Sequence, residues 1–453
     1  MSGRAAGVGL RRNILYGLAG WAAPAAVVLA SYAVLIRHLG AARFGIFVLA
    51  GSMSGLLAFL DFGFAAATLR FVAEDQARGN LRAAGEVVVS SLAFYGMLGA
   101  GGAATLQFLA PWLVKMLGVE THVAPEAIEA FRLAGWQFPA FLLLAVFVSL
   151  FKGLQHFAAA ALTLASLSTL AYGGAAVAAG LTRAGLREVM AISLAAHVLV
   201  LAAAAAGAWR LCHVRGIFLH RARPTRAVFR RMFEFGWLMT ANAFAAIFLY
   251  QIQRYLVAAT LGPAAVAVYQ TAGAGPAKVH QAVAAATEVL FPAASAAADP
   301  RTLRSIYLWM LAGSGMAAAS ALLPLVWLAP RILGLWLGPE MAAQALPLLP
   351  AFAAAYFFIA FSPAPFHLLN GLGKPWLNTA FTALAAALNV ALLCFLWVRG
   401  LSLLGFAWAF AGSSIAATLL FQVVVEIHIW RRGLLRVRQR PVAGAADDQM
   451  EWA

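Results

Sequence analysis

Residues 189–209 read VMAISLAAHVLVLAAAAAGAW, a run of 21 residues without a charged side chain. A helix of about 20 apolar residues matches the hydrocarbon core of a bilayer, so this stretch predicts a membrane-spanning helix. The whole chain is similar, because 63% of its 453 residues are hydrophobic and 11% are charged, against roughly a quarter in soluble domains. This composition excludes a soluble enzyme, a disordered chain and a disulfide scaffold.

Further apolar stretches of similar length predict about twelve transmembrane helices in total. The predicted spans lie near residues 14–36, 45–67, 85–110, 131–151, 158–180, 189–209, 233–258, 265–291, 305–328, 343–368, 376–397 and 404–429. The segments between them are too short for a soluble domain. We therefore expect an all-α polytopic membrane protein.

The charge distribution predicts which side of the membrane each connection faces. The net charge is +16, but the basic residues lie mainly between the spans, which disfavours nucleic acid as a partner and favours anionic membrane lipids. With the N-terminus in the cytoplasm, the inner segments carry 22 Lys and Arg and the outer segments carry 8. Because basic residues concentrate on the cytoplasmic side, both termini are predicted to be cytoplasmic.

The two halves of the chain form an internal repeat. A shift of 222 residues places Leu39-Gly40 on Leu261-Gly262, and the order of the spans agrees in both halves. Six spans per half predict a parallel repeat with a cleft between two lobes, which is typical of alternating access. The predicted parts are an N-terminal lobe at 1–209, a basic cytoplasmic linker at 210–231, a C-terminal lobe at 232–430 and a cytoplasmic tail at 431–453.

Charged residues inside predicted spans are candidate functional residues, because a charge at a span centre costs about 2.5–3.5 kcal/mol. Arg254 shares a helix face with Gln251, and two interpretations fit it: it faces the cleft, or it extends to the outer headgroups. Lys278, Gln281 and Glu288 share a face of the next span. They form either a structural pair or a cationic patch in which Glu288 takes a proton or ion. His280 points elsewhere and is interpreted as a packing histidine.

Other candidates concern coupling, gating and bending. Asp61 either supports the helix structure near Gly63 or takes part in coupling or gating, together with Arg70 at the cytoplasmic end of the same span. Pro24, Pro363 and Pro365 remove backbone donors inside spans. Each is either a hinge or a plain kink.

Neutral polar residues line one face of the span near 376–397. Asn378, Thr382 and Asn389 either hydrogen-bond to neighbouring helices or face a sugar. The chain has no nucleotide-binding loop, no hydrolase motif and no metal-spaced cluster, and its two cysteines stand alone. We therefore expect a protein that is not an enzyme and needs no cofactor or metal.

Several short motifs together resemble the polysaccharide-transporter family, which includes O-antigen-type flippases of the MATE-like superfamily. The motifs are Ile36 to Gly45, Leu60 to Gly63 with Arg70 to Glu74, Leu261 to Tyr269, Leu290 to Ser295, and Leu333 to Gly338. The resemblance covers nearly the whole chain. It implies a MATE-like fold of two six-helix lobes in the bacterial inner membrane.

The resemblance also implies a substrate. Such proteins flip a polyprenyl-diphosphate-linked oligosaccharide to the periplasmic leaflet for O-antigen, exopolysaccharide or capsule synthesis, alongside polymerase and chain-length proteins. Arg254 and Lys278 would meet the diphosphate, and Gln251, Gln281 and Asn378 would line the cavity. One departure is Gln253, where relatives often carry Asp, which puts ion coupling in doubt. A multidrug or cation antiporter and a peptidoglycan-precursor flippase remain alternatives.

Overall fold

The computed structural model describes residues 2–287, 300–372, 374–400 and 402–427, and within them the chain is helical without strands. The first half contains α1 (Ser2–Leu56), η1 (Leu57–Asp61), α2 (Phe64–Ala77), α3 (Leu81–Met116), α4 (Ala124–Gly153), α5 (Phe157–Ser168), η2 (Thr169–Gly173), α6 (Gly174–Thr182) and α7 (Leu186–Val214). After η3 (Leu219–Arg221), α8 (Arg226–Tyr250) leads into the second half. It contains α9 (Ile252–Leu261), α10 (Pro263–Thr287), α12 (Pro300–Trp327), α13 (Ala329–Leu337), α14 (Pro339–Ala345), η4 (Leu346–Leu348), α15 (Leu349–Ile359), α16 (Pro363–Gly371), α17 (Pro375–Arg399) and α18 (Leu403–Val424).

Ten helical stretches of the described chain are long and apolar enough to cross a membrane, which confirms a polytopic helical membrane protein. The predicted spans near 14–36 and 45–67 count as one stretch here, although two helical segments of α1 meet at a kink at Gly40, the one position of α1 with non-helical dihedral angles. The second of these predicted spans continues beyond α1 through η1 into α2. The span near 265–291 corresponds to α10, which carries Gln270, Lys278 and Gln281 and is not among the ten stretches.

Glycines at equivalent places in the repeat adopt the same unusual backbone. Gly40 has φ 79° and ψ 166°, and Gly262 has φ 83° and ψ 167°. Gly338, between α13 and α14, has φ 85° and ψ 164°. This region is accessible almost only to glycine. Each of the three glycines thus changes the direction of the chain between two helical segments that follow directly on one another.

Replacing Gly262 is expected to destabilise the protein. Alanine at φ 83° would cost about 1–3 kcal/mol of backbone strain, so the Gly262→Ala variant should unfold at a lower temperature in detergent. Gly334→Ala is the control, because a Cβ there meets nothing within 4 Å and the backbone is helical. Equal unfolding temperatures for the two variants would contradict the strain argument.

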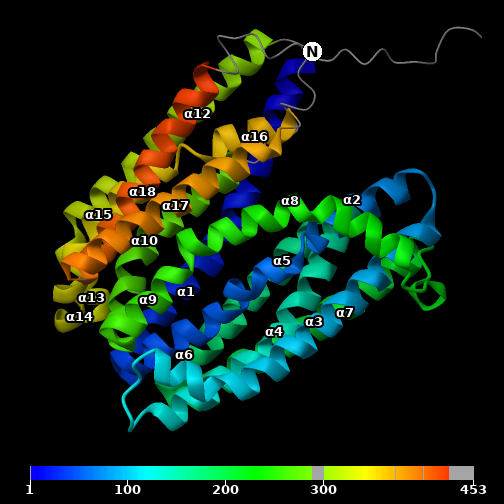
Figure 1. The fold of residues 1–453 in the computed structure, drawn as a ribbon. Coiled ribbons are helices and arrows are strands. Elements are labelled where there is room, and N and C mark those ends of the chain that lie inside the picture. The colour runs from blue at the N-terminus through cyan, green and yellow to red at the C-terminus, as the bar shows by residue number, and fades with distance from the viewer. Residues whose placement is uncertain (1, 288–299, 373, 401, 428–453) are drawn as a thin grey trace, which may run out of the picture.

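Buried apolar residues show where the two halves meet. One cluster includes residues of both halves, such as Phe44, Phe131, Val268 and Phe352. It lies at the end of the molecule where the chain turns at Gly40 and Gly262, which we call the seam end. Towards the other end, the halves have separate clusters. We call that the linker end, because residues 215–225 lie there. The two groups of helices accordingly lie together at the seam end and diverge towards the linker end (Figure 1).

Helix α8 belongs partly to each half. Its beginning packs on the first half, where Met232 joins the apolar cluster of α2–α7 and a Cβ on Gly236 would lie 2.0 Å from the carbonyl oxygen of Phe62. Further along, α8 packs on α17, and it crosses between the two groups in Figure 1. The sequence predicts a second lobe from residue 232. The backbones of Gly63 and Gly236 lie in contact, so the beginning of α8 packs on the first half, and the division into lobes stays a prediction.

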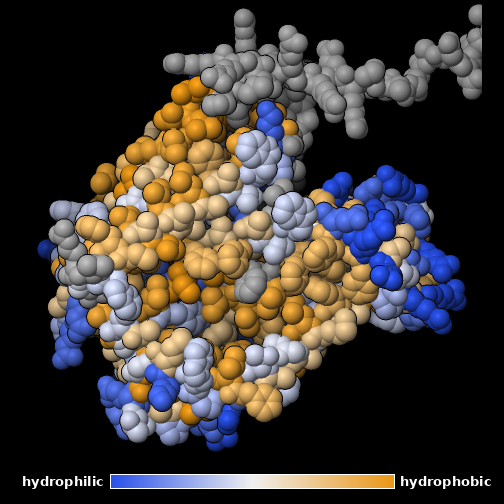
Figure 2. Space-filling model, in the orientation of Figure 1, coloured by the Kyte–Doolittle hydropathy of each residue, from blue (hydrophilic) through white to orange (hydrophobic). Residues whose placement is uncertain are grey.

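The surface has the pattern of a membrane protein. Figure 2 shows hydrophobic residues over the middle of the molecule and hydrophilic residues gathered at the linker end, around α2 and the α7–α8 connection. A second hydrophilic area lies at the opposite edge. Large exposed apolar side chains such as Phe108, Trp309 and Leu335 lie outside the core, as expected where lipid rather than water is the solvent.

Candidate functional site

Arg254 is a partly buried cation at the meeting of the two halves. It lies in the first turn of α9, and its Nη1 donates a hydrogen bond to Gln251 Oε1 at 2.9 Å. Gln251 sits at the break between α8 and α9, and its Nε2 occupies the space beside Gly55 of α1, 2.9 Å from where a Cβ would stand. Among the described residues no carboxylate pairs with Arg254.

Several tyrosines from both halves lie near this guanidinium. Those within electrostatic range of Arg254 are Tyr32, Tyr172, Tyr255, Tyr269 and Tyr356. Arg254 also lines a small cavity of about 50 Å³ with Gln270 and Phe410, and Gln270 donates to Tyr32 across the seam at 3.2 Å. The charge thus has neutral polar groups near it and no carboxylate partner among the described residues, which leaves it available to an anion. The cavity itself holds a few water molecules at most.

Lys278 lies on α10 but does not line the cavity of Arg254. Its Nζ donates to Gln281 Oε1 at 3.0 Å, so the predicted polar stripe is present for these two residues. Lys278 makes no ion pair within the described ranges. The third member of the stripe, Glu288, lies outside the described residues.

Gln253 is bound into a neutral hydrogen-bond network. Its Nε2 donates to Asn389 Oδ1 at 2.9 Å, and its Oε1 accepts from the hydroxyl of Tyr269. Asn389 in turn donates to Ser413 Oγ at 3.0 Å. All these side chains are buried. Asn389 therefore contacts α9 and α18, and it is not among the residues that line the cavity of Asn378 and Thr382.

Asn378 and Thr382 line a larger cavity inside the second half, of about 400 Å³. Asn378 Nδ2 donates to Phe366 O at 3.1 Å and to Asn370 Oδ1 at 2.9 Å, which holds α16 against α17. His280 lines the same cavity, and its Nδ1 is buried without a partner. His280 is therefore not the satisfied packing histidine that the sequence predicts.

The prolines differ in their effect on the helices. Helix α15 ends at Ile359 and α16 begins at Pro363, and Gln422 of α18 donates to the carbonyl of Phe361 in the break at 2.7 Å. Pro365 lies within α16. Pro24 lies in α1 where the dihedral angles stay helical. A break therefore forms at Pro363 and not at Pro24, and the hinge role of all three remains a prediction.

Asp61 is engaged with the beginning of α2. Its Oδ1 accepts from the backbone N of Ala65 at 3.2 Å and from the hydroxyl of Tyr95. A carboxylate at a helix N-terminus is stabilised by the free N–H groups there. This geometry suits a structural role for Asp61, and its predicted part in coupling remains untested.

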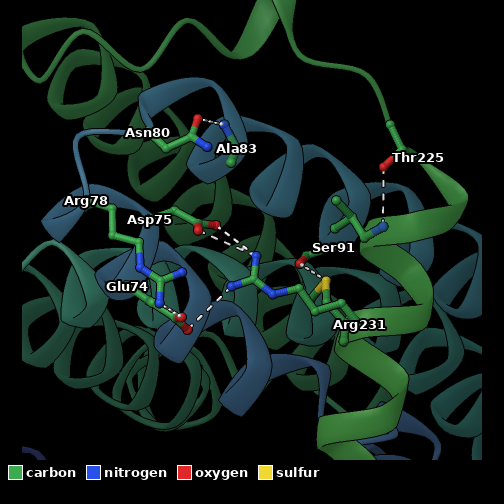
Figure 3. Close-up of polar contacts among 10 residues, drawn as sticks. Glu74, Asp75, Arg78, Asn80, Ala83, Ser91, Thr225 and Arg231 are labelled. Carbon is green, nitrogen blue, oxygen red and sulfur yellow. Dashed lines mark hydrogen bonds and ion pairs between the residues drawn. The ribbon is translucent and has the colours of Figure 1, made fainter.

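An ionic cluster joins α8 to α2 at the linker end (Figure 3). Arg231 points from α8 towards Asp75 and Glu74, at 3.2 and 3.4 Å, and its guanidinium lies 3.9 Å from the ring centroid of Phe71. The side chain of Asp75 is only 5% exposed. Arg70, predicted to act in gating, is exposed and stacks on Phe235 of α8 at 4.6 Å.

Removing this cluster is expected to weaken the attachment of α8 to the first half. Arg231→Met would remove the guanidinium that pairs with buried Asp75, which should lower the free energy of unfolding by about 1–3 kcal/mol. Arg230→Met is the matched control, because its pair with Glu234 is exposed and such pairs contribute about 0–1 kcal/mol. Thermal unfolding in detergent measures both, and an Arg231 variant as stable as the Arg230 variant would contradict this role.

Sequence reasoning missed some of these residues. The Arg231–Asp75 contact joins positions 156 residues apart, and nothing in either segment identifies the other as its partner. The tyrosines near Arg254 come from five different elements of the chain. Only Arg254 itself carried a signal, as a charge inside an apolar stretch.

Comparison with known proteins identifies the relatives of this architecture. The model of a family described as polysaccharide biosynthesis protein matches residues 10–298, which is more than half of the chain. The chain belongs to the polysaccharide biosynthesis protein family. This family member is 24% identical over 413 residues to a Shigella flexneri protein named "Putative O-antigen transporter", covering 91% of this chain and 96% of that protein. The predicted resemblance to polysaccharide transporters is thereby confirmed.

Solved structures with the same fold are also transporters. An inward-facing multidrug resistance MATE transporter of the MOP superfamily gives a TM-score of 0.75 at 16% identity, covering 88% of this chain and 92% of that one. The lipid II flippase MurJ, in an inward closed conformation, gives 0.73 at 12% identity, covering 91% and 87%. These likenesses confirm the MATE-like fold of this member of the polysaccharide biosynthesis protein family. At such low identities, the solved structures show the fold and not the substrate.

Proposed function

We propose that the protein flips a polyprenyl-diphosphate-linked oligosaccharide from the cytoplasmic to the periplasmic leaflet of the bacterial inner membrane. The observation that carries the proposal is Arg254, a guanidinium at the seam between the halves without a carboxylate partner in the described chain. A buried cation is costly unless an anion meets it. Membership of the polysaccharide biosynthesis protein family and likeness to an O-antigen transporter support a diphosphate as that anion.

The linker end would face the cytoplasm. The excess of basic residues in segments such as 210–231 supports this orientation, with both termini cytoplasmic. The halves are separate at the linker end and joined at the seam end, so the molecule has the arrangement that admits substrate from the cytoplasmic side. The lobes would be 1–209 and 232–430 as in the sequence repeat, with the beginning of α8 carried by the first.

The mechanism is alternating access, with Arg254 as the positively charged group that binds the substrate. The cavity at Arg254 holds only about 50 Å³ in this conformation and is lined by residues of the second half, so a diphosphate reaches the guanidinium only when this part of the protein opens. Charge-assisted hydrogen bonds from Arg254 offset the desolvation of the diphosphate. Lys278, one residue beyond Ala277 of the cavity wall, would contact it on entry, and Gln251 and Gln281 would orient the two cations.

The neutral hydrogen-bond network at Gln253 limits which residues could couple transport to an ion. Gln253, Asn389 and Tyr269 satisfy one another, so this position offers no carboxylate to a cation. Coupling, if an ion drives transport, would rest on Asp61 or Glu288. A multidrug cation exporter is the less favoured alternative, because the group at the seam is a cation and would repel such substrates.

The experiment compares the leaflet distribution of the lipid-linked oligosaccharide in cells with and without the protein. Accessibility to a sugar-modifying enzyme supplied in the periplasm reports the outer fraction. We expect the oligosaccharide to accumulate on the cytoplasmic side without the protein, and complementation to restore it. An unchanged distribution would reject the proposed substrate, and drug-efflux measurements would then test the exporter alternative.

A further inference from the structure

The cavity of about 400 Å³ in the second half differs chemically from the site of Arg254. It lies between α8, α10, α16, α17 and α18, and its described lining contains no Asp, Glu, Lys or Arg. Neutral polar side chains from each of these helices alternate with the rings of Phe366, Phe381 and Phe421. A cavity of this size falls in the range of about 300–1,000 Å³ that takes small-molecule ligands.

Four of the residues that line the cavity have hydrogen-bonding capacity that the protein does not use. Asn242 Oδ1, His280 Nδ1, Asn378 Oδ1 and Ser414 Oγ are all buried without a partner. Buried polar atoms are normally paired, and each exception calls for an explanation. Their residues come from four different helices and all line this one cavity, so rotation of these side chains would present the unused groups to an occupant with several hydroxyl groups.

The position of the cavity relates it to the diphosphate site. Leu249 and Tyr250, at the end of α8, line both this cavity and the cavity of Arg254. In a lipid-linked oligosaccharide the first sugar is bonded directly to the diphosphate. A site for that sugar must therefore adjoin the phosphate site, as this cavity does.

We propose that this cavity binds an uncharged sugar residue of the lipid-linked substrate, next to the diphosphate at Arg254. The proposal rests on the proposed function and deepens it by assigning the substrate class. Amide, hydroxyl and imidazole groups bond to sugar hydroxyls, while the phenyl rings contact the apolar faces of the sugar. A sugar acid is disfavoured, because its carboxylate would be buried without a countercharge.

The test uses the purified full-length protein in nanodiscs and two soluble probes. Saturation-transfer NMR measures binding of methyl glucoside, which is neutral, and methyl glucuronoside, which carries a carboxylate. We expect the wild type to bind methyl glucoside and not methyl glucuronoside. We expect Asn242→Leu with Ser414→Ala to weaken methyl glucoside binding about tenfold, because two hydrogen bonds are lost. No binding of methyl glucoside to the wild type, or equal binding of both probes, would overturn the proposal.

Controls separate misfolding from loss of the site. Ser414→Ala is also measured alone, because its hydroxyl has no protein partner and its removal breaks no internal hydrogen bond. Ser90→Ala is the matched control, since Ser90 Oγ is likewise buried and unpartnered but lies on α3, outside the cavity. Unchanged methyl glucoside binding by both Ser414 variants would overturn the proposal, and loss confined to them would support it.

A third probe distinguishes this proposal from the proposed function. Bare polyprenyl diphosphate carries no sugar, so the Asn242 and Ser414 variant should bind it as the wild type does, whereas Arg254→Ala should not. If the Arg254→Ala variant binds bare polyprenyl diphosphate as the wild type does, the proposed diphosphate site is wrong. If the variant with Asn242→Leu and Ser414→Ala loses binding of methyl glucoside and of bare polyprenyl diphosphate alike, the cavity is not a separate sugar site.

Discussion

Flipping should be abolished when Arg254 and Lys278 are both replaced by alanine, while the protein still inserts. Each charge-assisted hydrogen bond to a phosphate contributes about 1.5–3 kcal/mol. Losing contacts from both cations should therefore lower the rate at limiting substrate by about a hundredfold or more. The readout is the outer-leaflet fraction of lipid-linked oligosaccharide in cells that lack the native protein.

The single variants separate the two cations. Arg254 lines the small cavity of about 50 Å³ and Lys278 does not, so Arg254→Ala should lower flipping more than Lys278→Ala. Arg254→Lys should be intermediate, because it keeps the charge but loses the planar fork that fits a phosphate. Arg183→Ala is the control, since Arg183 ends α6 at an exposed turn. Near-normal flipping by the double variant, at a normal membrane level, would reject the diphosphate site.

Replacing Gly45 by alanine should hold the two halves apart at the seam and so shift the protein towards the opposite, outward-open arrangement. A Cβ on Gly45 of α1 would lie 1.8 Å from the carbonyl oxygen of Pro263, which begins α10. This contact joins the two halves, together with the hydrogen bond between Ser52 Oγ and Tyr255 Oη at 2.9 Å. Gly45→Ala cannot be accommodated while the backbones touch, and overpacking of this kind costs about 1–3 kcal/mol.

That cost falls only on the conformation in which the seam is closed. A penalty of about 1.4 kcal/mol changes a conformational ratio tenfold. A cysteine introduced as Ser52→Cys, with Cys212 and Cys394 replaced by serine, should therefore react about tenfold faster with an impermeant thiol reagent in the Gly45→Ala background. Transport should fall as well, because the seam no longer closes fully.

Gly96→Ala is the matched control for the Gly45→Ala substitution. Gly96 also lies inside a long helix, but a Cβ there meets nothing within 4 Å. Its labelling rate should equal that of the parent. Equal rates for Gly45→Ala and Gly96→Ala would show that the α1–α10 contact does not restrain opening of the seam.

The sequence alone determined the features that depend on composition and on local backbone chemistry. Long apolar runs identified a helical membrane protein, and the repeat aligned Gly40 with Gly262, two positions whose dihedral angles only glycine readily adopts. The break at Pro363 followed from a missing backbone donor. The combination of short motifs also indicated the family. Each of these properties resides in a few neighbouring residues.

Tertiary structure decided what each helix face meets. Asn378 and Asn389 lie on the same helix, yet one lines the large cavity and the other closes the network with Gln253. Likewise α8 is shared between the halves because Gly63 and Gly236 allow their backbones to touch. In a membrane, lipid-facing and protein-facing surfaces are both apolar. Periodicity therefore shows which residues share a face, but only packing selects the partner of that face.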